Sequence, residues 1–145
     1  MTRATALLVT LLATGPGCGS PAVGDPVPDA GSTGPTPKLS TITANVFAPT
    51  CATIGCHTGN PPVRAPDSLD PPLVYRLVGK PSLQVPAMPI VDPGNAGHSY
   101  LVQKIEGTAA SVGGVATRMP LGSAPLADDD IAAIQAWIQA GAPND

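Results

Sequence analysis

The tightest constraint on this chain is a short segment with two cysteines and a histidine, CATIGCHTG, at residues 51–59. Four residues separate Cys51 from Cys56, and His57 directly follows the second cysteine. A disulfide bond can close so short a loop, or both sulfur atoms can bond to a shared group. The choice depends on the compartment of the protein and on the ligands that distant residues supply.

The first residues have the pattern of an export signal. Arg3 supplies a positive charge, an apolar stretch covers residues 4–13, and small residues with a turn former follow. This stretch is shorter than the roughly 20 apolar residues that cross a bilayer. We therefore expect residues 1–17 to be a signal peptide of the lipoprotein type, with Cys18 as the lipidated N-terminus. Ordinary cleavage nearby, which would leave Cys18 as a stray thiol, is the alternative.

A linker is expected to follow the signal. Residues 18–37 are rich in proline and glycine and contain no aromatic residue, lysine or arginine. Because this composition cannot form an apolar core, we expect a disordered tether. Residues 38–145 would then form the folded domain. The net charge is −3 and the chain has no cluster of basic residues, which argues against nucleic acid as a partner.

Four short helices are expected in the domain. Ser40 or Thr41 would cap the first, and Pro49 would end it before Cys51. The others are expected within residues 71–80, 97–107 and 126–143, each with a glycine near its end. No segment shows the alternation of a strand. The apolar residues expected to be buried are Ile42, Val46, Phe47, Leu73, Tyr75, Leu77, Val78, Tyr100, Leu101, Ile105, Ile131, Ile134, Trp137 and Ile138.

The side chains available for a core are few and mostly small. The chain has one tryptophan, one phenylalanine and two tyrosines among 145 residues. A domain of about a hundred residues built from short helices and long loops buries a limited apolar area. A large, flat, apolar cofactor at its centre would supply the missing cohesion.

The cysteine segment has the residue types that covalent haem attachment requires. Two thiols add across the two vinyl groups at one edge of the porphyrin, and a histidine after the second thiol brings its imidazole under the iron; the usual motif is C-x-x-C-H. Gly55 would ease an outward bulge of the longer spacer between Cys51 and Cys56. Cysteines of an exported protein become bonded because the compartment is oxidising, so export favours either haem attachment or a disulfide.

A second iron ligand would have to come from far along the chain. Met119 is the leading candidate, because the following Pro120 favours an extended loop at this position. Met88, which also precedes a proline, and His98 are its rivals. Ligation by histidine and methionine is typical of electron-transfer cytochromes. Arg118 could pair with a haem propionate, or it could face solvent.

Three segments, in this order, resemble exported class I cytochrome c-like domains of planctomycetes and myxobacteria: VFAPTCATIGCHTG, HSYLVQKIEG and TRMPLGSAPLADDDIAAIQAWIQAGA. The resemblance implies a mostly α fold, a small bundle of three to four short helices around one haem c, with long Pro/Gly-rich loops. Carried over by position, Cys51 and Cys56 would form the thioethers, His57 would be the proximal ligand and Met119 the distal one.

The expected function is therefore one-electron transfer and not enzymatic catalysis. The partner would be a periplasmic or membrane redox protein, and a lipid anchor would hold the chain at the periplasmic face of a bacterial membrane, with the outer membrane favoured. Peroxidase-like activity would be possible only if Met119 did not bind the iron. The alternative is a haem-free helical binding module at the cell surface, stapled by a Cys51–Cys56 disulfide. Zinc would need further ligands, and beyond this cluster the expected domain offers only His98 among the nitrogen and sulfur donors that zinc prefers.

Overall fold

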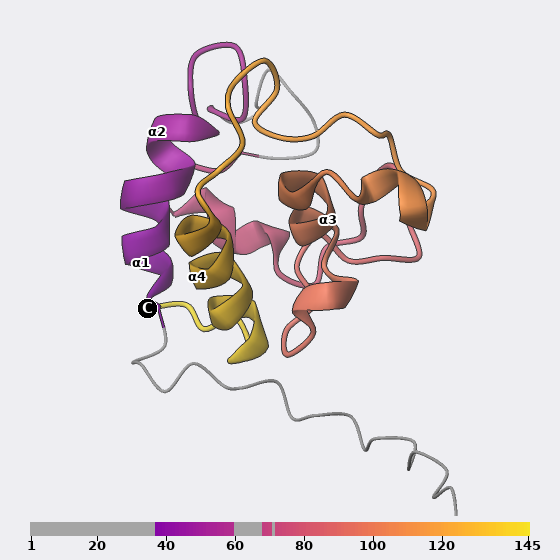
Figure 1. Cartoon of the computed structure of the whole chain (residues 1–145). Coiled ribbons are helices and arrows are strands. Elements are labelled where there is room, and N and C mark those ends of the chain that lie inside the picture. Colours follow the sequence, from indigo (N-terminus) through magenta and orange to yellow (C-terminus); the bar gives the residue numbers. More distant parts are fainter. Residues whose placement is uncertain (1–36, 60–67, 71) are drawn as a thin grey trace, which may run out of the picture. The chain divides into compact units, whose positions relative to one another are not determined.

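A computed structural model describes residues 37–59, 68–70 and 72–145 (Figure 1). The expected signal peptide (1–17), Cys18 and all but the last residue of the expected tether (18–37) lie outside the described residues. In the described part, helices are the only extended regular elements, and β-type pairing occurs as isolated bridges such as the one between Val78 and Val91. The fold of this part is thus mostly helical and without strands, in agreement with the expected class.

The helices are short, and several have a register other than α. In chain order they are α1 (Leu39–Ile42), the π-helix η1 (Thr43–Phe47), α2 (Ala48–Thr50), the 3₁₀ helices η2 (Leu73–Leu77) and η3 (Ala96–His98), α3 (Tyr100–Glu106), the 3₁₀ helix η4 (Ala109–Val112) and α4 (Asp128–Gln139). Elements α1, η1 and α2 follow one another without a break and end directly before Cys51.

The expected cap of this first helical segment was wrong, and its end before Cys51 was predicted correctly but is not caused by Pro49. The helix begins at Leu39, and neither Ser40 nor Thr41 caps it. Instead the Leu39 N–H donates a hydrogen bond of 2.7 Å to the carboxylate of Asp145 at the other end of the chain. Pro49 lies inside α2 and does not end it. The change from π to α register puts this proline in the first turn of a new helix, where its missing N–H is tolerated.

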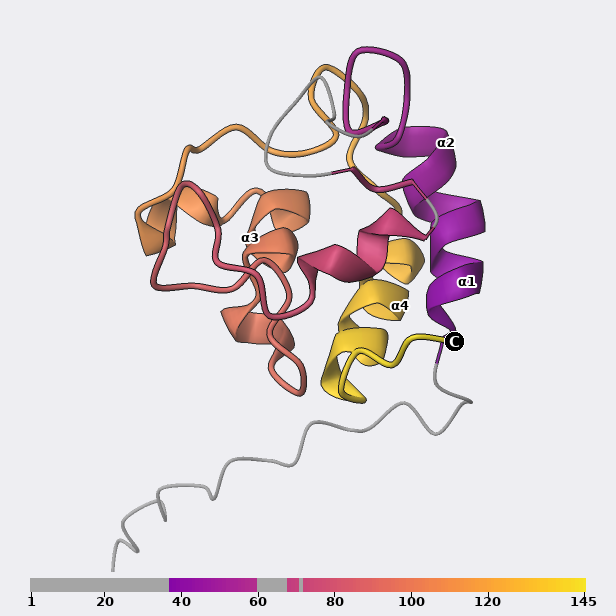
Figure 2. The same cartoon turned by 180° about the vertical axis from the view of Figure 1, so that it is seen from behind.

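Helix α4 packs against both α1 and α3 (Figures 1 and 2). Three aspartates occupy its first turn, where the helix dipole favours negative charge. Its apolar stripe is buried as expected, and Trp137 at 1% exposure also donates a hydrogen bond of 2.9 Å from Nε1 to the Pro143 carbonyl. Ten of the side chains expected in the core are buried: Ile42, Val46, Phe47, Leu77, Tyr100, Ile105, Ile131, Ile134, Trp137 and Ile138.

The prediction for residues 71–80 was only partly correct. A helix forms there, but it is the five-residue 3₁₀ helix η2. Because 3₁₀ helices have three residues per turn, they turn a different set of side chains inward than an α-helix would. Val74 and Leu77 are buried, Val78 is half-buried and Tyr75 is 39% exposed. Leu101 on α3 is half-buried, and the side chain of Leu73 lies outside the described part.

Candidate cofactor site

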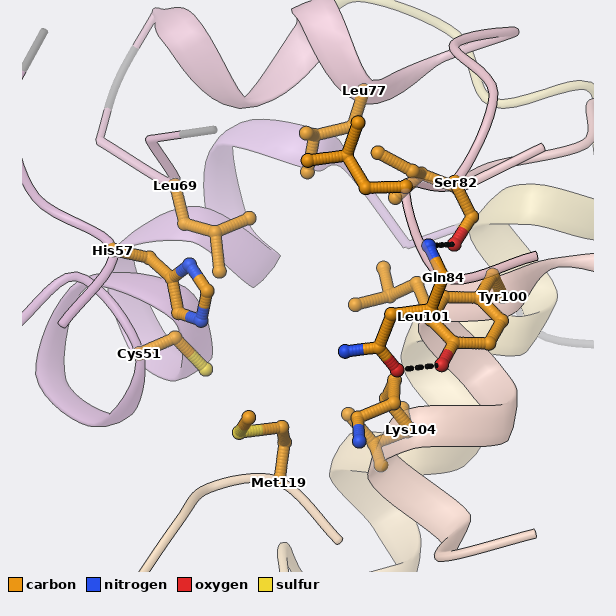
Figure 3. A pocket seen from close by; sticks show the side chains of 13 residues that line it. Cys51, His57, Leu69, Leu77, Ser82, Gln84, Tyr100, Leu101, Lys104 and Met119 are labelled. Carbon is orange, nitrogen blue, oxygen red and sulfur yellow. Dashed lines mark hydrogen bonds between the residues drawn. The ribbon is translucent and has the colours of Figure 1, made fainter. Parts of the chain in front are cut away.

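An apolar pocket lies between the cysteine segment, α3 and the loop that carries Met119 (Figure 3). Water-sized molecules could occupy about 150 Å³ of it, and the hollow encloses about 790 Å³ when the part open to solvent is included. Protein interiors are close-packed and rarely leave voids larger than a water molecule. Leu69, Leu77, Leu83, Ile90, Leu101 and Ile105 form the apolar lining. The remaining lining residues are Cys51, His57, Ser82, Gln84, Tyr100, Lys104 and Met119.

The chain turns sharply after α2 and thereby brings Cys51 and His57 to one wall of the pocket. The Cys51 N–H donates to the Phe47 carbonyl at 2.9 Å, and the His57 N–H donates back to the Cys51 carbonyl at 3.1 Å. Gly55 has a φ of +82°, a left-handed conformation in which glycine is favoured. Both the sulfur atom of Cys51 and the ring of His57 point into the pocket (Figure 3). Cys56 lies in the turn itself and does not line the pocket.

Both cysteines of the motif are free thiols in the structure. Cys51 is buried, with 8% of its surface exposed, and this burial raises the pKa of its thiol. The Thr50 hydroxyl lies 3.3 Å from the sulfur and opposes the shift, while nearby Cys56 adds to the increase in the Cys51 pKa. Free thiols at both positions can form thioethers to one macrocycle or a disulfide, so they do not separate these alternatives.

The chain on the C-terminal side of His57 is anchored by hydrogen bonds. The His57 carbonyl accepts the Leu69 N–H at 2.8 Å. One carboxylate oxygen of Asp70 accepts the Gly59 N–H at 2.7 Å and the Thr58 hydroxyl at 2.8 Å. These donors lower the pKa of the Asp70 carboxyl group. The backbone of His57 is thus held by hydrogen bonds on both sides.

Met119 is positioned by the end of α3. As the sequence predicts, it lies on a loop, and its peptide bond with Pro120 is cis. The Met119 N–H donates to the Lys104 carbonyl at 2.9 Å, and the Nε of Arg118 donates to the Ile105 carbonyl at 2.8 Å. Met119 is half-buried and its thioether points into the pocket (Figure 3).

The other candidate residues do not line the pocket. Met88 is buried in a small separate cluster with Tyr100 and Ala109. The ring of His98 is 47% exposed, and its Nδ1 lies 2.8 Å from the carboxylate of Asp92. Arg118 does not line the pocket and instead holds the end of α3 as described above. Of the residues proposed from the sequence, Cys51, His57 and Met119 are brought together.

Four polar residues of the pocket wall were not identified as site residues from the sequence: Ser82, Gln84, Tyr100 and Lys104. The Tyr100 hydroxyl donates to Gln84 Oε1, which also accepts the Val115 N–H at 3.1 Å. Burial raises the pKa of Tyr100 and lowers that of Lys104. The spacing of Tyr100 and Lys104, one helical turn apart, was a signal that both share a face of α3.

The donor set can be tested against the groups that it could hold. No three His, Cys, Asp or Glu side chains of the described residues are grouped so that they could hold a metal ion. A protein-bound zinc ion needs about four such ligands. A haem contributes four nitrogen ligands of its own and takes one or two from the protein, histidine and methionine among them. His57, Met119 and the Cys51 thiol in an apolar pocket therefore fit a haem.

Comparisons of the chain with protein-family models, with curated proteins and with solved structures find no match. Within the part of the chain that the structure describes, every helix is too short or too polar to traverse a bilayer. The functional interpretation consequently rests on the residues of the pocket and on the motifs in the sequence.

Proposed function

We propose that this protein is an exported electron carrier of the cytochrome c type with one covalently bound haem. Cys51 and Cys56 would form the thioether bonds, His57 would be the proximal iron ligand and Met119 the distal one. When bound, the haem supplies a one-electron couple between ferric and ferrous iron. The partner would be a periplasmic or membrane redox protein.

The observation that carries the proposal is the convergence of His57 and Met119 on one apolar pocket. The two residues lie on segments far apart in the sequence, and both side chains point into the same space (Figure 3). Cys51, the first residue of the attachment motif, lines that space too. A methionine that served only for packing would not need to line the same pocket as the histidine of this motif.

The residues of the pocket have separate tasks in this proposal. His57 and Met119 would both hold the iron and leave no position for a substrate, so transfer of an electron is favoured over catalysis. A methionine ligand and the apolar walls would both favour ferrous iron and raise the reduction potential. Export and a lipid anchor at Cys18 are part of the proposal on the strength of the first eighteen residues of the sequence.

The first experiment determines whether haem is attached. The full chain is expressed together with a cytochrome c maturation system, and its mass and its visible spectrum after reduction are recorded. We expect the mass of the processed polypeptide plus one haem, and sharp α and β bands that survive denaturation and acid–acetone extraction. A colourless protein whose mass equals that of the polypeptide less two hydrogens would refute the proposal and favour the disulfide-stapled binding module.

The second experiment tests the distal ligand in the matured protein. Met119→Ala should abolish the low-spin spectrum typical of histidine–methionine ligation. Met88→Leu is the matched control, since Met88 is a buried methionine outside the pocket lining. We expect the control to keep the wild-type spectrum. The ligand assignment is wrong if Met119→Ala leaves the spectrum unchanged or if Met88→Leu abolishes it.

A further inference from the structure

The pocket wall contains a buried cation that the proposed function has not used. Lys104 on α3 lines the pocket and has only 8% of its surface exposed. Transferring an ammonium group from water to a protein interior is costly unless an opposite charge and hydrogen bonds compensate it. Burial of a lysine in a mostly apolar cavity is therefore unfavourable unless such groups surround it.

The described neighbours of Lys104 provide hydrogen bonds but no negative charge. Its Nζ donates to the carbonyls of Val115, at 3.1 Å, and Thr117. Within the described ranges no carboxylate lies at ion-pair distance from this nitrogen. An ammonium group has three N–H donors, so one remains beyond the two that the carbonyls accept. Burial also lowers the pKa of Lys104, which is the expected sign for a cation lacking a compensating charge.

A second hydrogen-bond donor lies on the same wall. The Val115 N–H can only donate, so the oxygen of the Gln84 amide must face it, and the Tyr100 hydroxyl donates to the same oxygen. The amide nitrogen of Gln84 is consequently turned away from both, into the pocket (Figure 3). This wall lies across the pocket from Cys51 and His57 (Figure 3).

We infer that the occupant of the pocket carries a carboxylate at this end and that Lys104 binds it, assisted by Gln84. The inference rests on the proposed function and deepens it, because a haem carries its two propionates on the edge opposite its vinyl groups. A macrocycle bonded at Cys51 would therefore present its carboxylates to Lys104. The propionate contact is thereby assigned to Lys104 in place of Arg118, whose Nε is engaged by the Ile105 carbonyl.

The test compares a ligand with and without its carboxylates. The full chain carrying Cys51→Ala and Cys56→Ala, which prevents covalent attachment, is titrated with haem and with haem dimethyl ester, and quenching of the Trp137 fluorescence is followed. We expect haem to bind at least about tenfold more tightly than the ester. Lys104→Met should reduce this ratio to near one, while Lys104→Arg should retain most of it. Lys38→Met, at an exposed lysine, is the control and should leave the ratio unchanged.

The outcomes separate this inference from the proposed function. Equal binding of haem and ester by the parent protein overturns the role of Lys104 and leaves the haem proposal standing. A ratio that persists in Lys104→Met also overturns it. If neither porphyrin binds, an anionic and a neutral aromatic probe, anilinonaphthalenesulfonate and N-phenylnaphthylamine, decide whether the pocket itself prefers an anion, while the mass of the matured wild-type protein decides the proposed function. The parent comparison needs no substitution at Lys104, so it decides the question even if Lys104→Met fails to fold.

Discussion

Gly107→Ala tests the link between α3 and the Met119 loop. Gly107 ends α3 with a φ of +81°, and a Cβ at this position would lie 3.2 Å from Cδ and 3.3 Å from Cγ of Arg118. Gly113 ends η4 in nearly the same conformation, with a φ of +87°, but has no atom within 4 Å of such a Cβ. Comparing Gly107→Ala with Gly113→Ala therefore separates the cost of the backbone conformation from the cost of displacing Arg118.

The expected magnitudes follow from these contacts. A left-handed conformation costs an L-residue about 1–2 kcal/mol, and the smaller entropy of the unfolded chain returns about 0.4–1 kcal/mol. We thus expect Gly113→Ala to lower the free energy of unfolding by about 1 kcal/mol. Gly107→Ala should lower it by about 2 kcal/mol, because the shifted Arg118 weakens a hydrogen bond from a charged donor to the Ile105 carbonyl, worth about 1.5–3 kcal/mol when intact.

Urea unfolding of the single and double variants measures the coupling. In an Arg118→Ala background, Gly107→Ala should cost only as much as Gly113→Ala, which gives a coupling energy of about 1 kcal/mol between positions 107 and 118. Gly113→Ala should show no coupling to Arg118→Ala. Equal costs for the two glycine variants in the wild-type background, or additive effects at positions 107 and 118, would refute the proposed contact.

Two further predictions concern the chain ends and the pH dependence. Asp145→Ala should lower the free energy of unfolding by about 1 kcal/mol, because the first N–H of α1 loses its acceptor. Urea unfolding measures this cost, and a cost no larger than that of neighbouring Asn144→Ala would contradict the contact. Hydrogen bonds lower the pKa of Asp70 in the folded state. The ionised Asp70 carboxylate therefore stabilises the fold above the unfolded-state pKa of about 3.9, and this stabilisation is lost as the pH falls through the lower folded-state pKa. Asp70→Asn should therefore flatten the decline of stability below about pH 4, and an unchanged pH profile would show that these bonds do not favour the ionised form.

The parts of the fold that the sequence predicts are those determined by local chemistry. The end of α3 was predicted because Gly107 adopts the left-handed conformation that glycine favours. The start of α4 was predicted from the run of aspartates at its first turn. The cap of α1 could not be predicted, because its acceptor is Asp145, more than a hundred positions away in the chain. Such a long-range contact leaves no trace in the pattern of neighbouring residues.

The residues of the candidate site likewise include some that the sequence predicts and some that it does not. Cys51, His57 and Met119 stand out in the sequence because their types and neighbours are unusual, and the structure brings them to one pocket. Lys104 did not stand out, since a lysine on a short helix is normally solvated. It is buried because the loop at residues 115–119 folds over it and accepts its hydrogen bonds. That arrangement follows from the path of a loop, which periodicity does not reveal.

The path of this loop has a physical cause at the end of α3. The last carbonyls of a helix have no partner within it and must find donors elsewhere. The Lys104 carbonyl accepts the Met119 N–H, and the Ile105 carbonyl accepts the Nε of Arg118. The side chain of Lys104 then donates to two carbonyls earlier in the same loop. Because the helix end and the loop satisfy each other's polar groups, the polypeptide itself holds Met119 at the pocket, and an occupant would meet a thioether that is already in position.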